Sequence, residues 1–229
     1  MVKEIIQDNG MRAVARQTMG DHVYEQLRDA IMRGRLPGGS ELNQVEIAGQ
    51  LGVSRVPVRE ALRRLQAEHL IEANPFHRYV VVTLPRDTVL ELFDLRAELE
   101  VFASVRAVGR DDFHDSVDSI REAAGLLALD MGTDEWIAAD MEFHRRIHGP
   151  ETAVTTIIDE IRVRIYRYVH LAEPDVARRE QVLEEHEGII DALVRGDVEQ
   201  VRNRVRAHVE HTRDRLAKAG WPDGAATEG

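Results

Sequence analysis

One short segment, from Gly52 to Leu65, constrains the fold of this chain more than any other. Ser54 can cap a helix through its hydroxyl after the turn at Gly52, and Pro57 falls in the first helical turn, where a missing N–H costs little. The helix that follows has an apolar face formed by Val58, Leu62 and Leu65. Its opposite face carries arginines spaced by four, at Arg55, Arg59 and Arg63. Such a cationic helix after a tight turn suits the major groove of DNA.

The residues before this segment predict the other two helices of a helix-turn-helix. Apolar residues recur at helical spacing from Val23 to Ile31, and the pattern stops at Gly34. Asn43 and Glu46 then have the spacing of a capping box, at the start of a short helix whose buried face is Ile47, Ala48 and Leu51.

Two short apolar stretches after the cationic helix predict a β-hairpin. The strands are Leu70 to Glu72 and Tyr79 to Thr83, and the tip between them, Asn74 to Arg78, has cationic character. Residues 15–84 are therefore predicted to form a winged helix-turn-helix. An arginine row can also be an ordinary solvated helix face. Its combination with the turn and the wing favours DNA binding.

The remainder of the chain predicts an all-helical second domain over residues 85–219. It shows no strand-like alternation, and Gly, Pro and capping residues separate its helix-forming stretches. Six antiparallel helices would make a bundle, with expected spans of 87–108, 111–131, 133–148, 151–171, 175–195 and 197–218. The fold class is mainly α, with an unstructured leader expected at residues 1–14 and a loose tail at 220–229.

The distribution of charge and the composition restrict how the chain can bind DNA and where in the cell it is found. The net charge of −11 is uneven: residues 1–85 hold 11 Lys/Arg and 10 Asp/Glu, whereas residues 86–229 hold 19 and 31. An acidic second domain weakens nonspecific attraction to phosphates while a local arginine cluster, including Arg64, still engages DNA. There is no cysteine, and no stretch approaches the roughly 18 apolar residues of a membrane span. We expect a cytoplasmic protein without disulfides.

A second set of polar residues predicts a metal site in the bundle. Asp140 and His144 are spaced i, i+4 and so share one helix face, and His186 and His208 can each add one imidazole from a later helix. Three nitrogens and one oxygen suit Zn²⁺, Ni²⁺, Mn²⁺ or Fe²⁺. The alternative is surface hydrogen bonding, and His148 and His211 leave the choice of ligands open from spacing alone.

The cationic segment resembles the GntR family of regulators, whose Gly-Val-Ser-Arg-x-Pro-Val-Arg-Glu-Ala-Leu core is present at residues 52–62, after Pro37-Gly38. The resemblance implies DNA contacts from the third helix, at Ser54, Arg55, Val56 and Arg59, and from the wing, at His77 and Arg78. Arg63 extends the arginine row of the helix by one more turn. Three positions depart from the family. Val56 replaces a frequent threonine, Tyr79 a wing glycine, and Val45 an arginine that can contact DNA.

The second domain resembles the effector domain of the FadR subfamily, known as the FCD domain, and its six helices are typical of the VanR-type branch. Metal-binding members place ligands at the positions of Asp140, His144, His186 and His208. Arg96 matches an arginine that faces the ligand cavity, so the resemblance implies a small organic acid as effector. The alternative for Arg96 is a surface ion pair with Glu100. The turn at residues 149–153 departs from the family's Ser-x-Asn-Pro-like pattern.

These observations together predict a homodimeric repressor that binds a palindromic operator and releases it when its effector binds at the metal. Arg59→Ala is expected to remove specific operator binding without unfolding the protein. A metal-responsive regulator without an organic effector is one alternative. A metal-dependent hydrolase with an appended DNA module is the other, but no Ser/His/Asp set, phosphate loop or His-Glu-x-x-His motif accompanies the ligands. We therefore expect no enzymatic activity.

Overall fold

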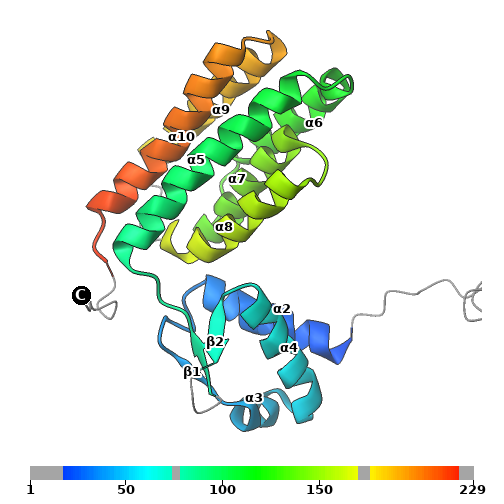
Figure 1. The fold of residues 1–229 in the computed structure, drawn as a ribbon, viewed down its shortest axis with the longest axis vertical. Coiled ribbons are helices and arrows are strands. Elements are labelled where there is room, and N and C mark those ends of the chain that lie inside the picture. Colours follow the sequence, from blue (N-terminus) through cyan, green and yellow to red (C-terminus); the bar gives the residue numbers. More distant parts are fainter. Residues whose placement is uncertain (1–17, 74–77, 170–175, 222–229) are drawn as a thin grey trace, which may run out of the picture.

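A winged-helix domain and a helical bundle lie end to end in the computed structural model, which describes residues 18–73, 78–169 and 176–221 (Figure 1). The winged-helix domain contains α2 (Met19–Met32), α3 (Gln44–Leu51) and α4 (Arg55–Ala67). The bundle follows from residue 86 onward. The expected mainly helical fold is confirmed. No helix in the described ranges is long and apolar enough to cross a membrane.

Local sequence explains where the helices of the winged domain begin and end. Thr18 and Asp21 form a capping box at the start of α2. The Asn43 side chain accepts hydrogen bonds from the backbone N–H groups of Val45 and Glu46 at the start of α3. Gly52 ends α3 in the left-handed conformation, with φ of 65°, where glycine has no steric cost.

The expected side-chain cap at Ser54 is wrong. Ser54 occupies the N-cap position of α4 but makes no capping hydrogen bond. An N-cap hydroxyl accepts from the second or third helical N–H. The third helical residue is Pro57, which has no N–H to donate. The buried face of α4 is as expected, because Val58, Leu62 and Leu65 are fully enclosed.

The wing is part of a three-stranded antiparallel sheet with the order β1-β3-β2. β2 (Ile71–Ala73) and β3 (Tyr79–Val81) form the expected hairpin, with Ile71 opposite Val81. β1 (Glu41–Leu42) was not expected, because two residues carry no periodicity, and it pairs with β3 through Glu41 and Val80. The expected cationic tip lies outside the described residues except for Arg78.

The bundle contains six helices in the described ranges, close to the expected spans. They are α5 (Arg86–Val108), α6 (Phe113–Leu126), α7 (Thr133–His148), α8 (Ala153–Val169), α9 (Val176–Val194) and α10 (Val198–Lys218). Helices α5 and α10 pack along one another over much of their length, with α7 and α8 on one side and α9 on the other (Figure 1).

Two local features differ from the expected bundle. Helix α6 ends at Leu126 rather than near residue 131. Trp221 lies in the segment expected to be a loose tail, yet its ring stacks on Tyr168 with centroids 5.0 Å apart. A large aromatic surface gains from leaving water, so this residue packs onto the bundle.

Helix α8 joins the two domains. Its Val163 and Tyr166 pack against the core of the winged domain. The phenol of Tyr168 accepts a hydrogen bond of 2.7 Å from the backbone N–H of Leu84, and Arg167 donates to the backbone carbonyl of Val82. The main chain of the strand-to-helix connection is therefore fastened to α8 by hydrogen bonds with two α8 side chains.

Candidate functional site

The exposed face of α4 carries a row of unrestrained guanidinium groups. Arg55, Arg59 and Arg63 are exposed, and within the described residues none of them has an ion pair or side-chain hydrogen bond. Val56 and Ser54 are exposed beside them. The helix therefore presents cations and two small side chains to solvent from one surface, as an element that enters a DNA groove would.

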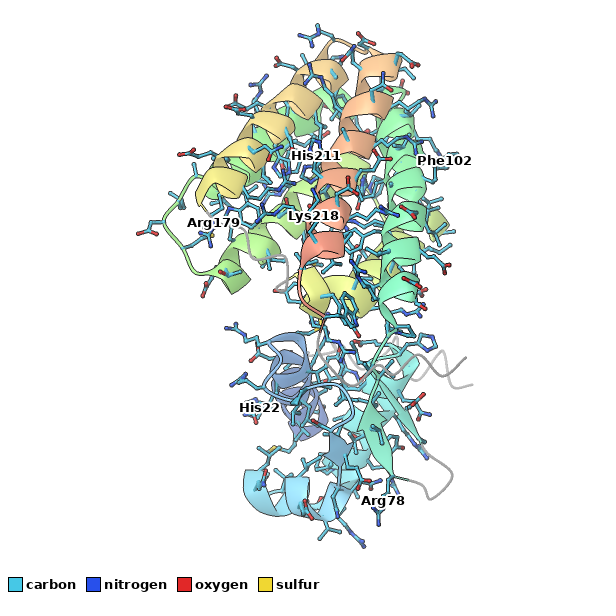
Figure 2. The ribbon with its side chains drawn as sticks, turned by 90° about the vertical axis from the view of Figure 1, so that its left-hand side faces the viewer. His22, Arg78, Phe102, Arg179, His211 and Lys218 are labelled. Carbon is cyan, nitrogen blue, oxygen red and sulfur yellow. The ribbon has the colours of Figure 1, made fainter. Side chains whose placement is uncertain are left out.

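Two nearby arginines are held by the protein instead. Arg64 forms an ion pair of 2.5 Å with Asp21 and lies over the ring of Tyr24, 3.8 Å from its centroid. These contacts fasten α4 to α2, although the Arg64 side chain stays about half exposed, so its expected part in the DNA-facing cluster stays a prediction. Arg78 pairs with Glu41 of β1 at 2.9 Å, and Figure 2 shows it at the end of the winged domain that lies away from the bundle. His77 lies outside the described residues.

The four expected metal ligands come together inside the bundle. Asp140 and His144 lie on α7, His186 on α9 and His208 on α10, and one ligand atom from each lies within 4.8 Å of the others. The three imidazoles are almost completely buried. The spacing within α7 is local, but the meeting of α7, α9 and α10 is a result of helix packing.

Distances within this cluster suit a bound cation. The Nε2 atoms of His144 and His208 lie 3.0 Å apart, and His186 Nε2 lies 3.2 Å from Asp140 Oδ1. Two histidine ligands of a tetrahedral Zn²⁺ have nitrogens about 3.3 Å apart, given Zn–N bonds of about 2.0 Å. Within the described part of the chain, His186 Nε2 and Asp140 Oδ1 are buried without an aligned hydrogen bond despite their proximity, so both retain electron pairs for a cation.

Two carboxylates outside the cluster orient its histidines. Glu185 Oε2 lies 2.7 Å from His208 Nδ1, and Glu100 Oε2 lies 3.0 Å from His144 Nδ1, although the second contact is not aligned as a hydrogen bond. A carboxylate partner favours the tautomer with hydrogen on Nδ1. Both Nε2 lone pairs then face the same point, where a cation would accept them. The site residues therefore fit a divalent metal.

Burial keeps the histidines of this region neutral. It lowers the pKa of His144 to about 3 and that of His186 to about 4, since a charged imidazole is poorly solvated there. The pKa of His148, the other histidine near Glu100, falls to about 4 for the same reason. Neutral imidazole is the form that binds metals, so these three side chains are poised as ligands or ligand neighbours at neutral pH.

His148 does not join the four-residue cluster. Its Nε2 atom lies 3.9 Å from Glu100 Oε2 and, among the described residues, has no hydrogen bond. Glu100, His144 and His148 form a second group with ligand atoms close together. Glu100 already bonds Arg96 and Arg162 through its other oxygen, so two positive charges oppose a second cation there. His211 lies nearly half exposed on α10 (Figure 2). Its Nδ1 atom lies 2.7 Å from Glu185 Oε1.

A cavity of about 50 Å³ adjoins the cluster. This is space for about four water molecules, or for a small ligand. Asp140 and His208 form part of its wall, so the cavity reaches the metal cluster directly. Most of the other polar groups on its wall are the guanidinium groups of Arg96, Arg162, Arg178 and Arg215. The remaining wall is largely apolar and includes Trp136, Ile137, Ile165 and Val182.

Arg96 lines this cavity, and it also pairs with Glu100 at 2.5 Å. The expectation of an Arg96–Glu100 pair on the surface is wrong in its location, because Glu100 is completely buried. Arg162 of α8 bonds the same Glu100 oxygen at 2.7 Å. Burial raises the pKa of Glu100, but the charges of Arg162 and Arg96 outweigh it and hold the pKa well below its ordinary value.

Three site residues were not predicted from the sequence: Arg162, Arg178 and Glu185. Arg178 is buried on the cavity wall, where it bonds Glu185 at 2.7 Å and Thr212 at 3.2 Å. Arginines and glutamates are frequent on helices, and only burial separates these from solvated ones. An arginine on the apolar face of α8, between Ile161 and Ile165, was the available signal.

Comparisons with known proteins identify both domains. Residues 19–81 match the bacterial regulatory proteins of the gntR family, and residues 91–211 match the FCD domain. The chain is 31% identical to the Nta operon transcriptional regulator of Aminobacter aminovorans, over 83% of this chain and 90% of the relative. It is 28% identical to the probable D-xylose utilization operon transcriptional repressor of Paenarthrobacter nicotinovorans, over 88% of this chain and 90% of the relative.

A solved structure shares the fold of both domains. The structure of E. coli McbR/YncC superposes with a TM-score of 0.69 at 23% identity, covering 88% of this chain and 98% of the other. The family and these relatives are transcriptional regulators rather than enzymes, as expected from the sequence. The chain therefore belongs to the GntR family of DNA-binding transcriptional regulators and carries an FCD effector domain.

Proposed function

We propose that this regulator is a cytoplasmic homodimeric repressor whose affinity for a palindromic operator changes when a small carboxylate binds beside a metal in the FCD domain. The observation that carries the proposal is the arginine-lined cavity that opens onto the Asp140/His144/His186/His208 cluster. One relative is a probable operon repressor, which supports repression. Assignment to the VanR-type branch stays a prediction.

DNA binding is assigned to α4 and the wing. The exposed guanidinium groups of Arg55, Arg59 and Arg63 suit phosphates and guanine edges. Val56 offers methyl groups that suit thymine, in place of a hydroxyl. Ser54, His77 and Arg78 remain proposed contacts. An isologous dimer would present two such helices to two half-sites.

The exposed apolar residues of α5 support dimerisation through the FCD domain. Phe102 is half exposed, as is Leu95, seven residues earlier on the same helix face. Phe102 and Arg106 also line a surface groove with Val154 at the start of α8. Large apolar side chains grouped on a surface favour a protein partner, and a second copy of this chain would cover them.

Effector binding is assigned to residues of the cavity. Asp140, His144, His186 and His208 would hold the metal, which would supply a Lewis-acidic position for an oxygen of the effector. Arg96, Arg162 and Arg178 would bind the effector carboxylate, since planar guanidinium groups match its two oxygens. The apolar part of the wall, including Trp136 and Ile137, would cover a short hydrocarbon portion.

Helix α8 is the proposed path from the cavity to DNA. Its residues Arg162, Ile165 and Tyr166 line the cavity, while Val163 and Tyr166 pack on the winged domain. An effector that draws Arg162 away from Glu100 would shift α8 between two packings. The populations of the two domain orientations, and so the spacing of the paired α4 helices, would change with it.

Thermal unfolding with and without bound metal tests the proposal. Metal-loaded and EDTA-treated protein would be compared across a panel of small carboxylates, since a ligand that binds only the folded state raises Tm. A shift that needs both metal and one acid supports the effector site. A shift with metal alone favours the metal-responsive alternative, and no shift with either rejects the site. His186→Asn should abolish the metal shift, whereas His114→Asn, exposed on α6, should leave it unchanged.

A further inference from the structure

Glu185 touches both functional parts of the FCD domain. Its Oε2 atom bonds Nδ1 of His208 at 2.7 Å, and its Oε1 atom bonds Nη1 of Arg178 at 2.7 Å. His208 belongs to the metal cluster, and Arg178 lies on the cavity wall. One carboxylate on α9 therefore joins a metal-site imidazole to a cavity guanidinium.

The three side chains are held firmly enough to influence one another. Arg178 and His208 are almost fully buried, and Glu185 is 15% exposed. A hydrogen bond between charged groups is stronger in such surroundings than in water. Each Glu185 oxygen has a nitrogen partner at 2.7 Å, His208 Nδ1 on one side and Arg178 Nη1 on the other, so the carboxylate bridges the two side chains.

We propose that Glu185 is a positioning residue through which Arg178 sets the affinity of the metal cluster. The inference rests on the proposed metal site. A carboxylate that accepts from Nδ1 makes the Nε2 lone pair of the same imidazole a stronger ligand. A guanidinium on the other oxygen withdraws part of that negative charge. Arg178 therefore weakens the metal site through Glu185, although it lies outside the ligand set.

This arrangement gives the cavity and the metal cluster a reciprocal influence. An anion that draws Arg178 into the cavity returns charge to Glu185 and tightens metal binding through His208. A metal held by His208 Nε2 would polarise the Nδ1–H bond toward Glu185, which would loosen Arg178 for the anion. Equilibrium linkage requires the two effects to be equal in size.

The same pattern is present at the other side of the cluster. Glu100 Oε2 lies 3.0 Å from His144 Nδ1, while its Oε1 atom bonds the cavity arginines Arg96 and Arg162. Glu100 and Glu185 lie on different helices and contact different ligands. Two independent carboxylates thus each connect a cavity guanidinium to a cluster histidine, one by an aligned hydrogen bond and one by a close ionic contact.

The test measures Zn²⁺ affinity of the full-length protein by competition with a chromophoric chelator. Glu185→Gln should weaken Zn²⁺ binding about 10-fold or more, as for other residues that orient a metal-bound histidine. Arg178→Met should tighten it several-fold. In the Glu185→Gln background, Arg178→Met should have a markedly smaller effect, because its path through the carboxylate is gone. Circular dichroism and Tm check that each variant folds.

The Glu98–Arg206 ion pair supplies a matched control. It also joins a glutamate to an arginine across two helices, but it lies on the surface and, among the described residues, contacts no cluster histidine. Glu98→Gln and Arg206→Met should leave Zn²⁺ affinity unchanged. If Glu185→Gln does not fold, Glu185→Asp replaces it, with a weakening of the same sign because the shorter carboxylate cannot hold both partners.

The outcomes separate this inference from the proposed function. If the wild type binds Zn²⁺ and Arg178→Met has equal effects in both backgrounds, the arginine acts only through space and the inference is wrong, while the metal site stands. Unchanged affinity in Glu185→Gln would likewise overturn the inference and leave the metal site standing. If the wild type binds no Zn²⁺, the proposed metal site fails and the inference fails with it.

Discussion

Arginines serve the two ends of this molecule in opposite ways. On α4, Arg55, Arg59 and Arg63 are exposed and, within the described residues, unrestrained, whereas in the bundle Arg96, Arg162 and Arg178 are buried and bonded to carboxylates. Exposed cations attract any phosphate and are screened by salt. Buried, paired guanidinium groups respond only to a ligand that can replace their carboxylate. The first arrangement suits binding to DNA, and the second suits the small carboxylate proposed as effector.

Removing the carboxylate between two buried arginines should have the largest effect. Glu100→Gln leaves Arg96 and Arg162 without a negative partner in a buried site, so the free energy of unfolding should fall by about 3–5 kcal/mol. Urea denaturation would measure it. Glu98→Gln, two residues away and exposed, should cost at most about 1 kcal/mol. Equal losses in the two variants would contradict the distinction between buried and exposed arginine pairs.

Acidification should destabilise the bundle, which holds the buried histidines, and should leave the exposed arginines of α4 charged. His144, His148 and His186 have pKa values of about 3, 4 and 4 in the folded protein, below the unfolded value of about 6.5. The unfolded chain therefore binds more protons, and stability falls as the pH drops from about 6.5 toward 4, by up to about 1.4 kcal/mol per pH unit for each histidine. Tm measured in EDTA between pH 7.5 and 5 checks this. A constant Tm would show that these histidines are not buried as neutral groups.

Substitution of one exposed arginine should affect only DNA binding. Arg59→Ala should weaken operator binding by about 1–3 kcal/mol for each α4 and reduce its salt dependence, while Tm stays unchanged. Footprinting at several salt concentrations measures both effects. Arg121→Ala, which removes an exposed arginine from α6 in the other domain, is the control. Equal footprints for wild type and Arg59→Ala would remove Arg59 from the interface.

The smallest effect should distinguish the two helix starts of the winged domain. Asn43→Ala removes a side chain that bonds two backbone N–H groups and should cost about 1 kcal/mol of stability. Ser54→Ala removes a hydroxyl that makes no such bond and should change stability by less than about 0.5 kcal/mol. Thermal unfolding measures both, and a comparable loss in Ser54→Ala would contradict the absence of a cap at α4.

The sequence predicted those features that a helix or turn determines locally. The apolar spacing in α4 and the glycine at position 52 were sufficient to place the helix-turn-helix, and the i, i+4 spacing of Asp140 and His144 was sufficient to pair them. Strand β1 could not be predicted, because its two residues become a strand only by pairing with β3. The Ser54 cap was wrong because Pro57 lacks one of the two N–H groups that an N-cap serine can bond, and the hydroxyl makes no bond to the other, that of Val56.

In the candidate site, too, only contacts within one helix could be predicted from the sequence. Three glutamates flank His186, and only the rotation of α9 against α10 selects Glu185 as the partner of His208. Spacing did pair Arg96 with Glu100, but it gave no sign that both are buried or that Arg162 approaches from α8. Contacts between helices far apart in the sequence depend on packing that no local pattern encodes.

The proline at the third position of α4 has a consequence for how this helix meets its target. Without a serine cap, the first turn of α4 keeps its unbonded backbone donors and the positive end of its helix dipole facing outward. A phosphate oxygen of DNA is a suitable acceptor for such a helix end. The recognition helix is thus left incomplete in the free protein, and the nucleic acid itself would supply its cap.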